Sequence, residues 1–153
     1  MLEATTVASA LERAGIAGAA VAEENFLGLV VRLPIESARD ALIALRDGEP
    51  AFEQLIDTFG ADTGEGIEVT YRLRALSINE DLIVKSQIEY GGTLPSVIDA
   101  YLAVLLPERE LAELFGLYLE GHPNPKRLLT LDVTPPLLLK STPIRTREEL
   151  WSE

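Results

Sequence analysis

Residues 67–88 read IEVTYRLRALSINEDLIVKSQI, and this stretch predicts a β-hairpin. From residue 67 to residue 75, apolar and polar side chains alternate, which is the period-two pattern of a half-buried strand. Residues 79–81 (Asn-Glu-Asp) suit a turn, and the chain then returns with Leu82, Val84 and Ile88 on one face. The hairpin therefore predicts a β-sheet in the middle of the chain.

The segments before this hairpin predict further strands. Residues 19–22 and 26–33 are largely apolar and flank the polar residues 23–25, so they predict a second hairpin. Residues 52–59 are interpreted as a strand, although their apolar positions also fit a helical period. Strand pairs joined by short turns favour a sheet with hairpin connections over a doubly wound one.

Two helices are expected beside the sheet. Thr6 is placed to cap the first, and Gly15 to end it. Its predicted apolar face consists of Val7, Ala10, Leu11 and Ala14. The second helix follows Pro34 and ends at Gly48. Its predicted buried stripe consists of Ile35, Ala38, Leu42 and Leu45.

The last third of the chain is expected to hold more helix and then an extended tail. Gly91-Gly92 breaks the sheet, and Ser96 with Asp99 resembles a capping box that opens a helix through Leu106. Pro107 either interrupts that helix or starts another, which Gly116 closes. Residues 128–144, LLTLDVTPPLLLKSTPI, show no period, and a tail this apolar is expected to lie against something.

The predicted fold is an α+β two-layer sandwich with a mixed β-sheet. Its element order is α-β-β-α-β-β-β, followed by C-terminal helices and the extended tail. Since 153 residues suit one compact unit, residues 1–130 are assigned to a single domain and residues 131–153 to a Pro/Leu-rich tail.

Composition excludes several classes of function. The net charge of −12 and the aromatic content of 6% argue against nucleic-acid binding and against adsorption to an anionic bilayer. The absence of cysteine excludes disulfides, thiol catalysis and thiolate-bound zinc or iron-sulfur clusters in this chain. No apolar run reaches the roughly 18 residues of a membrane span, and the N-terminus lacks a basic signal region, so a soluble cytoplasmic chain is expected.

Residues 108–127 gather the candidate polar chemistry. Glu110 and Glu113 are three apart on a helix, so they suit an acid/base pair or a metal site of a small enzyme. The alternative is a solvated helix face on which Arg109 reaches Glu113. His122, the only histidine, makes a poor metal site alone, and the simpler interpretation is a loop histidine bonded to nearby backbone. A free-standing ligand-binding module also remains possible.

Phosphate-binding motifs are missing from the sequence. There is neither GxGxxG nor a Walker loop, and residues 64–66 (Gly-Glu-Gly) place a carboxylate where a phosphate would approach. Residues 91–93 (Gly-Gly-Thr) suit either an anion or a plain turn.

A longer pattern resembles a known family. ERELAELFG at residues 108–116, EGHP at 120–123 and RLL at 127–129 resemble the signature of the subunit designated C in NADH-quinone oxidoreductase (respiratory complex I), a signature shared with energy-converting membrane-bound hydrogenases. Residues 69–73, 82–88 and 95–97 fall where that family has strands and a helix start. The resemblance covers about residues 50–130. Glu113 departs from it, because the family usually has aspartate there.

The resemblance implies a subunit with no cofactor and no active site of its own. Such a subunit belongs to the peripheral arm, on the cytoplasmic side of the membrane, and packs on the hydrogenase-like large subunit. Iron-sulfur clusters and quinone, or a nickel-iron centre in a hydrogenase complex, are then expected in partner subunits. The expected partner interface is the leucine-rich tail together with Glu108, Arg109, Glu110, Phe115, Gly116, His122, Pro123 and Arg127.

Overall fold

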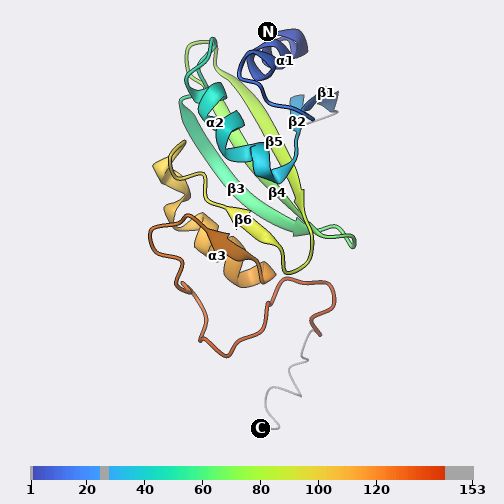
Figure 1. Ribbon diagram of the computed structural model, residues 1–153, viewed down its shortest axis with the longest axis vertical. Coiled ribbons are helices and arrows are strands. Elements are labelled where there is room, and N and C mark those ends of the chain that lie inside the picture. Colours follow the sequence, from blue (N-terminus) through green and yellow to red (C-terminus); the bar gives the residue numbers. More distant parts are fainter. Residues whose placement is uncertain (1, 25–27, 144–153) are drawn as a thin grey trace.

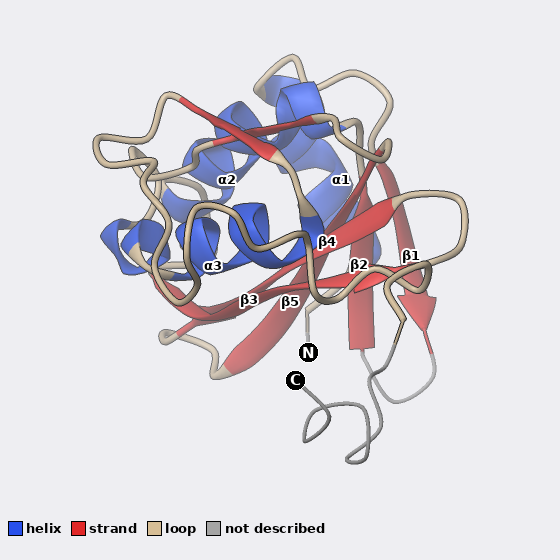
Figure 2. Ribbon diagram, turned by 90° about the horizontal axis from the view of Figure 1, so that it is seen from below, coloured by secondary structure: helices blue, strands red, loops and turns tan. Residues whose placement is uncertain are grey.

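The computed structural model describes residues 2–24 and 28–143, which form a five-stranded sheet with helices on one face (Figures 1 and 2). The elements through the sheet are α1 (Ala4–Arg13), β1 (Ala20–Glu24), β2 (Gly28–Arg32), the 3-10 turn η1 (Ile35–Ser37), α2 (Ala38–Arg46), β3 (Gln54–Asp62), β4 (Ile67–Ala75) and β5 (Glu80–Ile88). The strand order is β1-β2-β5-β4-β3, with β2 parallel to β5 and the other neighbours antiparallel. The predicted α+β class, mixed sheet and element order are confirmed.

The central hairpin of β4 and β5 is as predicted, with a shifted turn. Ile67 pairs with Ile88 and Ala75 with Glu80, so residues 76–79 form the turn and Glu80 already belongs to β5. Asn79 takes the left-handed conformation, with φ 53°, which asparagine adopts more readily than most residues. The alternate residues Ile67, Val69, Tyr71, Leu73 and Ala75 are fully buried under the helices.

The first helix begins earlier than predicted. The N–H of Thr6 donates to the carbonyl of Glu3, so Thr6 already lies inside the first turn and does not cap it. Val7 and Leu11 are buried as predicted, whereas Ala14 is exposed beyond the helix end. The expected stop is confirmed, because Gly15 has a positive φ and follows the last helical turn directly.

Strand β3 settles the ambiguity over residues 52–59. It pairs with β4 from Gln54 to Asp62, so the strand interpretation is confirmed and the helical alternative is wrong. A bulge between Leu55 and Asp57 adds a residue to the strand. This insertion breaks the alternation of apolar side chains, which explains why the sequence pattern resembled a helix.

The predicted helix from Ser96 to Leu106 is wrong. Only residues Leu102–Leu105 form a short 3-10 turn, η2. Asp99, the supposed partner of Ser96, instead pairs with Arg39 of α2, and the carbonyl of Asp99 accepts a bond from Arg46 at 2.7 Å. Tertiary contacts with α2 therefore outweigh the local helical signal in this segment.

The remaining elements frame the C-terminal region. Pro107 does start a helix, α3 (Pro107–Phe115), and Gly116 ends it in the left-handed conformation, as predicted. Two short strands that the sequence did not predict, β6 (Thr93–Pro95) and β7 (Tyr118–Glu120), form a parallel pair beside α3. Before β6 the chain makes a backbone turn, in which the N–H of Gly92 donates to the carbonyl of Glu89.

Residues 128–143 have no helix or strand, as expected, and they cross the lower end of the molecule in Figure 1. The N–H of Leu138 donates to the carbonyl of Leu114, and the N–H of Lys140 donates to Asp62 at the end of β3. The rest of the predicted tail, including Trp151, lies outside the described residues, and the domain division remains a prediction. No helix in the described ranges is long and apolar enough to cross a membrane.

Candidate functional site

Glu108 sits in the first turn of α3 and points into the protein, with none of its surface exposed. The Ser96 hydroxyl donates to its Oε2 at 2.6 Å and the Val97 N–H donates to its Oε1 at 2.7 Å. Burial raises the pKa of Glu108, and these hydrogen bonds together with His122 offset the rise only in part. Glu108 therefore ties α3 to the segment that follows β6.

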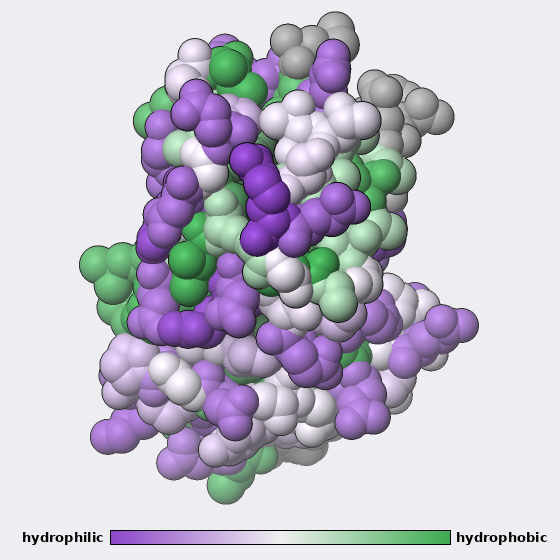
Figure 3. Space-filling model, turned by 45° about the horizontal axis from the view of Figure 1, so that its top comes forward, coloured by the Kyte–Doolittle hydropathy of each residue, from purple (hydrophilic) through white to green (hydrophobic). Residues whose placement is uncertain are grey.

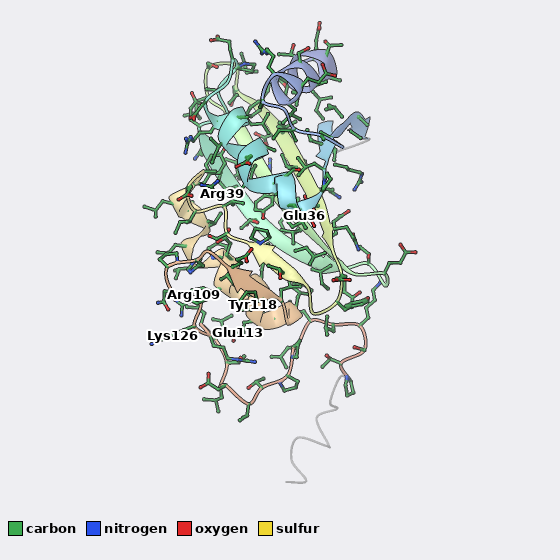
Figure 4. All side chains as sticks on the ribbon, in the orientation of Figure 1. Glu36, Arg39, Arg109, Glu113, Tyr118 and Lys126 are labelled. Atoms are coloured by element: carbon green, nitrogen blue, oxygen red, sulfur yellow. The ribbon has the colours of Figure 1, made fainter. Side chains whose placement is uncertain are left out.

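Arg109 and Glu113 bind the loop that runs beside α3 (Figure 4). The Arg109 guanidinium donates to the carbonyls of Lys126 at 2.7 Å and Arg127 at 2.8 Å. The Glu113 carboxylate accepts bonds from the N–H groups of three successive residues, Leu128, Leu129 and Thr130. The alternative interpretation, in which Arg109 reaches Glu113, is thus wrong, because each side chain bonds to backbone groups instead.

These hydrogen bonds keep the Glu113 carboxylate ionised. Burial opposes ionisation, but bonds from the Thr130 side chain and from the three N–H groups outweigh it and lower the pKa of Glu113 to about 2. Arg109, Glu113 and Arg127 line one surface hollow of about 360 Å³. A carboxylate held in this way is a structural anchor and cannot serve as a general acid near neutral pH.

Glu113 should stabilise the fold near neutral pH and lose this effect in acid. Its pKa is about 2 in the folded chain against 4.5 ordinarily, so its contribution is complete above the unfolded value and disappears as pH falls through the folded value. We expect Glu113→Gln to lower the free energy of unfolding by about 2–3 kcal/mol at neutral pH. In urea titrations this deficit should shrink in the acid range, and an undiminished deficit would contradict the assignment.

The structure does not support an acid/base pair at Glu110 and Glu113. Glu110 is exposed and lines a different hollow, between α3 and β3, from the one that Glu113 lines. A paired acid also needs a raised pKa, whereas the pKa of Glu113 is lowered. Within residues 2–24 and 28–143, no group of three or more His, Asp or Glu side chains is placed to hold a metal ion.

His122 is bonded to backbone at both ring nitrogens. The N–H of Asn124 donates to Nδ1 at 3.0 Å, so the ring proton resides on Nε2, which donates to the carbonyl of Leu105 at 2.9 Å. The interpretation of His122 as a loop histidine bonded to nearby backbone is confirmed. It joins the residues after β7 to η2.

The eight predicted interface residues lie together around α3 and the loop after β7, with different exposure. Glu108, Phe115 and His122 are buried within the chain, and Arg109, Gly116 and Arg127 are half-buried. Only Glu110 and Pro123 are largely exposed. A contact between these residues and a partner stays a prediction, and most of their polar groups already serve internal bonds.

Large apolar side chains are exposed on the loop that these residues hold. Leu129 is 61% exposed, Leu131 76% and Val133 89%. Leu137 and Leu138 are each about half exposed, and Tyr118 of β7 is 67% exposed. Further exposed leucines lie in and after η2. In Figure 3, apolar groups project from the left side of the molecule, which is the side where η2 lies in Figure 1.

Sequence reasoning did not predict the bonds of Glu113 to residues 128–130 or of Glu108 to Ser96. Neither pair shows a local signal, since the partners lie 12 or more residues apart. The parallel pair β6 and β7 was missed as well, because three-residue strands are too short to display a period.

Comparison with known proteins places these features in context. A family model described as "Respiratory-chain NADH dehydrogenase, 30 Kd subunit" matches residues 31–150. In Methylobacterium sp. (strain 4-46), the NADH-quinone oxidoreductase subunit that carries the letter C is 40% identical over 109 residues, which cover 68% of this chain and 49% of that one. In Bdellovibrio bacteriovorus, an NADH-quinone oxidoreductase subunit that carries both letters C and D is 35% identical over 104 residues, which cover 66% of this chain and 18% of that one.

A solved structure shares the fold. A chain of an archaeal respiratory membrane complex, the membrane-bound sulfane sulfur reductase, superposes with a TM-score of 0.68 and 28% identity, covering 83% of this chain and 75% of that chain. The present chain spans about half the length of most of the curated relatives it matches.

Proposed function

Because the chain belongs to the 30 kDa subunit family of respiratory-chain NADH dehydrogenase, we propose that it is a non-catalytic structural subunit of the peripheral arm of an NADH-quinone oxidoreductase. The match confirms the family resemblance predicted from residues 108–129. In this role the chain carries no cofactor, packs on the hydrogenase-like large subunit and supports electron transfer to quinone. Iron-sulfur clusters and quinone belong to neighbouring subunits, and the chain meets the cytoplasmic side of the membrane only through the complex.

The observation that carries this proposal is the apolar surface of residues 126–138, which we call the docking segment. Exposed leucines and a valine gather there on a backbone that α3 holds in place. Contiguous exposed apolar side chains typically mark contacts with another macromolecule. We therefore assign the docking segment to the contact with the large subunit.

Charge favours a protein partner over a lipid surface. The chain has a net charge of −12, which an anionic membrane would repel. Residues 117–143 differ, because Lys126, Arg127 and Lys140 outnumber Glu120 and Asp132. An apolar groove with carboxylates at its rim is therefore the complementary partner surface.

The Bdellovibrio relative supports a direct contact between two subunits. From its double letter, C/D, we infer one chain in which the subunits lettered C and D are joined, and the present chain matches only 18% of it. Covalent fusion is readily tolerated between chains that already lie side by side, because the linker then spans a short distance. We therefore take the subunit lettered D to be the large subunit that the docking segment contacts.

A second candidate is the equivalent subunit of an energy-converting nickel-iron hydrogenase complex. The solved neighbour keeps this candidate open, because its respiratory complex is named for sulfane sulfur and for neither NADH nor quinone, so the fold is not confined to complexes named for those two substrates. The activity of the complex that copurifies with a tagged chain separates the two candidates. NADH-dependent quinone reduction supports the first, and proton reduction supports the second.

Charged substitutions in the docking segment should release the chain from its complex. We expect the double variant Leu129→Asp with Leu131→Asp to reduce recovery of the large subunit, identified by mass spectrometry, by about tenfold or more, because two carboxylates would be buried without partners. Leu76→Asp is the matched control, since Leu76 is 58% exposed and its turn lies at the opposite end of the molecule in Figure 1. Recovery of the large subunit at the wild-type level with the double variant would rule out this surface.

A further inference from the structure

Two charged side chains of α3 bind the main chain of five consecutive residues of the docking segment. The Arg109 guanidinium donates to the carbonyls of residues 126 and 127, and the Glu113 carboxylate accepts from the N–H groups of residues 128, 129 and 130. None of these five residues lies in a helix or strand. The two side chains thus supply hydrogen bonds that secondary structure would otherwise provide.

The arrangement is unusual for side chains four apart on a helix. An arginine and a glutamate at this spacing commonly pair with each other across one turn. Here the guanidinium meets two acceptors and the carboxylate meets three donors, so each charge matches the polarity of the backbone beside it. Such charge-assisted bonds are about twice as strong as neutral ones.

Binding through the main chain leaves the leucine side chains of the segment available to a partner. Leu129 is held by its N–H although the residue is 61% exposed, and Leu131 next to the anchored region is 76% exposed. Further bonds fix the segment beyond this point, because Arg127 donates to the Thr130 hydroxyl and to the carbonyl of Thr134, each at 2.7 Å. The exposed leucines therefore project from an ordered backbone.

Order before binding has a thermodynamic consequence. Fixing each residue of a free loop costs conformational entropy, and a loop that orders only on docking subtracts this cost from the affinity. When α3 already holds the backbone, this conformational entropy is lost during folding and is not subtracted again on docking. The partner then gains the full benefit of burying the leucines.

We propose that Arg109 and Glu113 are positioning residues, which hold residues 126–130 in the docking conformation before the partner subunit arrives. The inference rests on the proposed function for its docking step, whereas the hold itself is a property of the isolated chain. It assigns Glu108, Arg109 and Glu113 to internal bracing, and direct partner contact to the apolar side chains that these residues hold in place.

Hydrogen exchange on the isolated full-length chain tests the hold. We expect Glu113→Gln, which keeps the shape but loses the charge, to speed exchange of the amides of residues 128–130 by about tenfold or more, because each loses a bond to a charged acceptor. Glu110→Gln removes the same charge from an exposed site of the same helix and should leave these amides unchanged. Glu113→Asp retains the charge and should restore protection to within about threefold of wild type. Wild-type exchange in Glu113→Gln would overturn the inference.

Reconstitution tests the docking step. Purified chain is added to membranes from cells that lack its gene, and the concentration that half-restores the complex is measured. We expect Glu113→Gln to raise this concentration about tenfold and Glu113→Asp to recover most of the loss. Faster exchange with an unchanged half-restoring concentration would overturn the docking role.

The two tests also separate this inference from the proposed function. If Leu129→Asp with Leu131→Asp reconstitutes like wild type, the docking surface fails, and the docking role of the brace fails with it. The exchange result would still decide whether Glu113 holds the loop. If the leucine variant fails to reconstitute but Glu113→Gln reconstitutes like wild type, the docking surface is supported and the proposed preordering is wrong.

Discussion

Replacing Glu108 by alanine is expected to lower the free energy of unfolding by about 2–4 kcal/mol, because the change leaves two buried donor groups without an acceptor. Those groups are the Ser96 hydroxyl, now 2.6 Å from Oε2, and the Val97 N–H, now 2.7 Å from Oε1. Urea denaturation near neutral pH measures the loss. An alanine variant as stable as wild type would show that the carboxylate is not the tie between α3 and residues 96–97.

Glu108→Gln is the matched control for this prediction. The glutamine carbonyl can accept from Val97 and its amide can donate to the Ser96 oxygen, so we expect a loss below about 1 kcal/mol. Glu108 also affects the pH dependence. Its pKa is raised in the folded chain, so the folded state holds the proton more tightly and stability falls as pH rises from the unfolded pKa to the folded one. Glu108→Gln should remove this slope.

Replacing Gly60 by valine is expected to cost about 2–3 kcal/mol, since the new side chain would separate α3 from the sheet. A Cβ on Gly60 of β3 would lie 2.8 Å from a methyl carbon of Leu111 and 2.8 Å from the ring of Phe115. Thermal or urea unfolding measures the cost. Reconstitution should also weaken, because α3 carries the residues that hold the docking segment.

Ala61→Val is the control for the β3 substitution. Ala61 is the next residue of the strand and is exposed, so added methyl groups there meet solvent and suit a strand. A similar loss of stability in both valine variants would show that close packing of α3 at Gly60 is not the cause.

Strong local patterns predicted the sheet well. The alternation along residues 67–75 marks the buried face of β4 directly, because every second side chain of a strand points the same way. The glycine stops after α1 and α3 were equally predictable, since their positive φ angles favour glycine over other residues. These features depend on neighbours in sequence.

The errors arose where a distant residue changed the outcome. Ser96 and Asp99 have the spacing of a capping box, yet Ser96 bonds Glu108 and Asp99 pairs with Arg39. Thr6 has the right chemistry for a cap, but the helix begins before it. Capping a helix is one of several roles that a polar side chain can take, and the packing of the whole domain decides which role it takes.

The sequence located the candidate site but did not predict the bonding partners of its charged side chains. The run from Glu108 to Arg127 does lie at one place in the fold, around α3 and the loop after β7. Its charges suggested catalysis or direct partner contact, and the structure directs most of them to backbone groups. The same charged residues are compatible with an external role or with internal bonding. Only their contacts in the folded chain distinguish the two.

The sequence by itself determined the α+β order, the central hairpin, the C-terminal end of α3 and the family, because these follow from periodicity, glycine chemistry, and a long ordered motif. Only the tertiary structure decided that Glu113 binds residues 128–130, that Glu108 is buried, and that the leucines of the docking segment face outward. These outcomes depend on which main-chain N–H and C=O groups near α3 have no partner in a helix or strand once the chain has folded. No local pattern encodes that geometry.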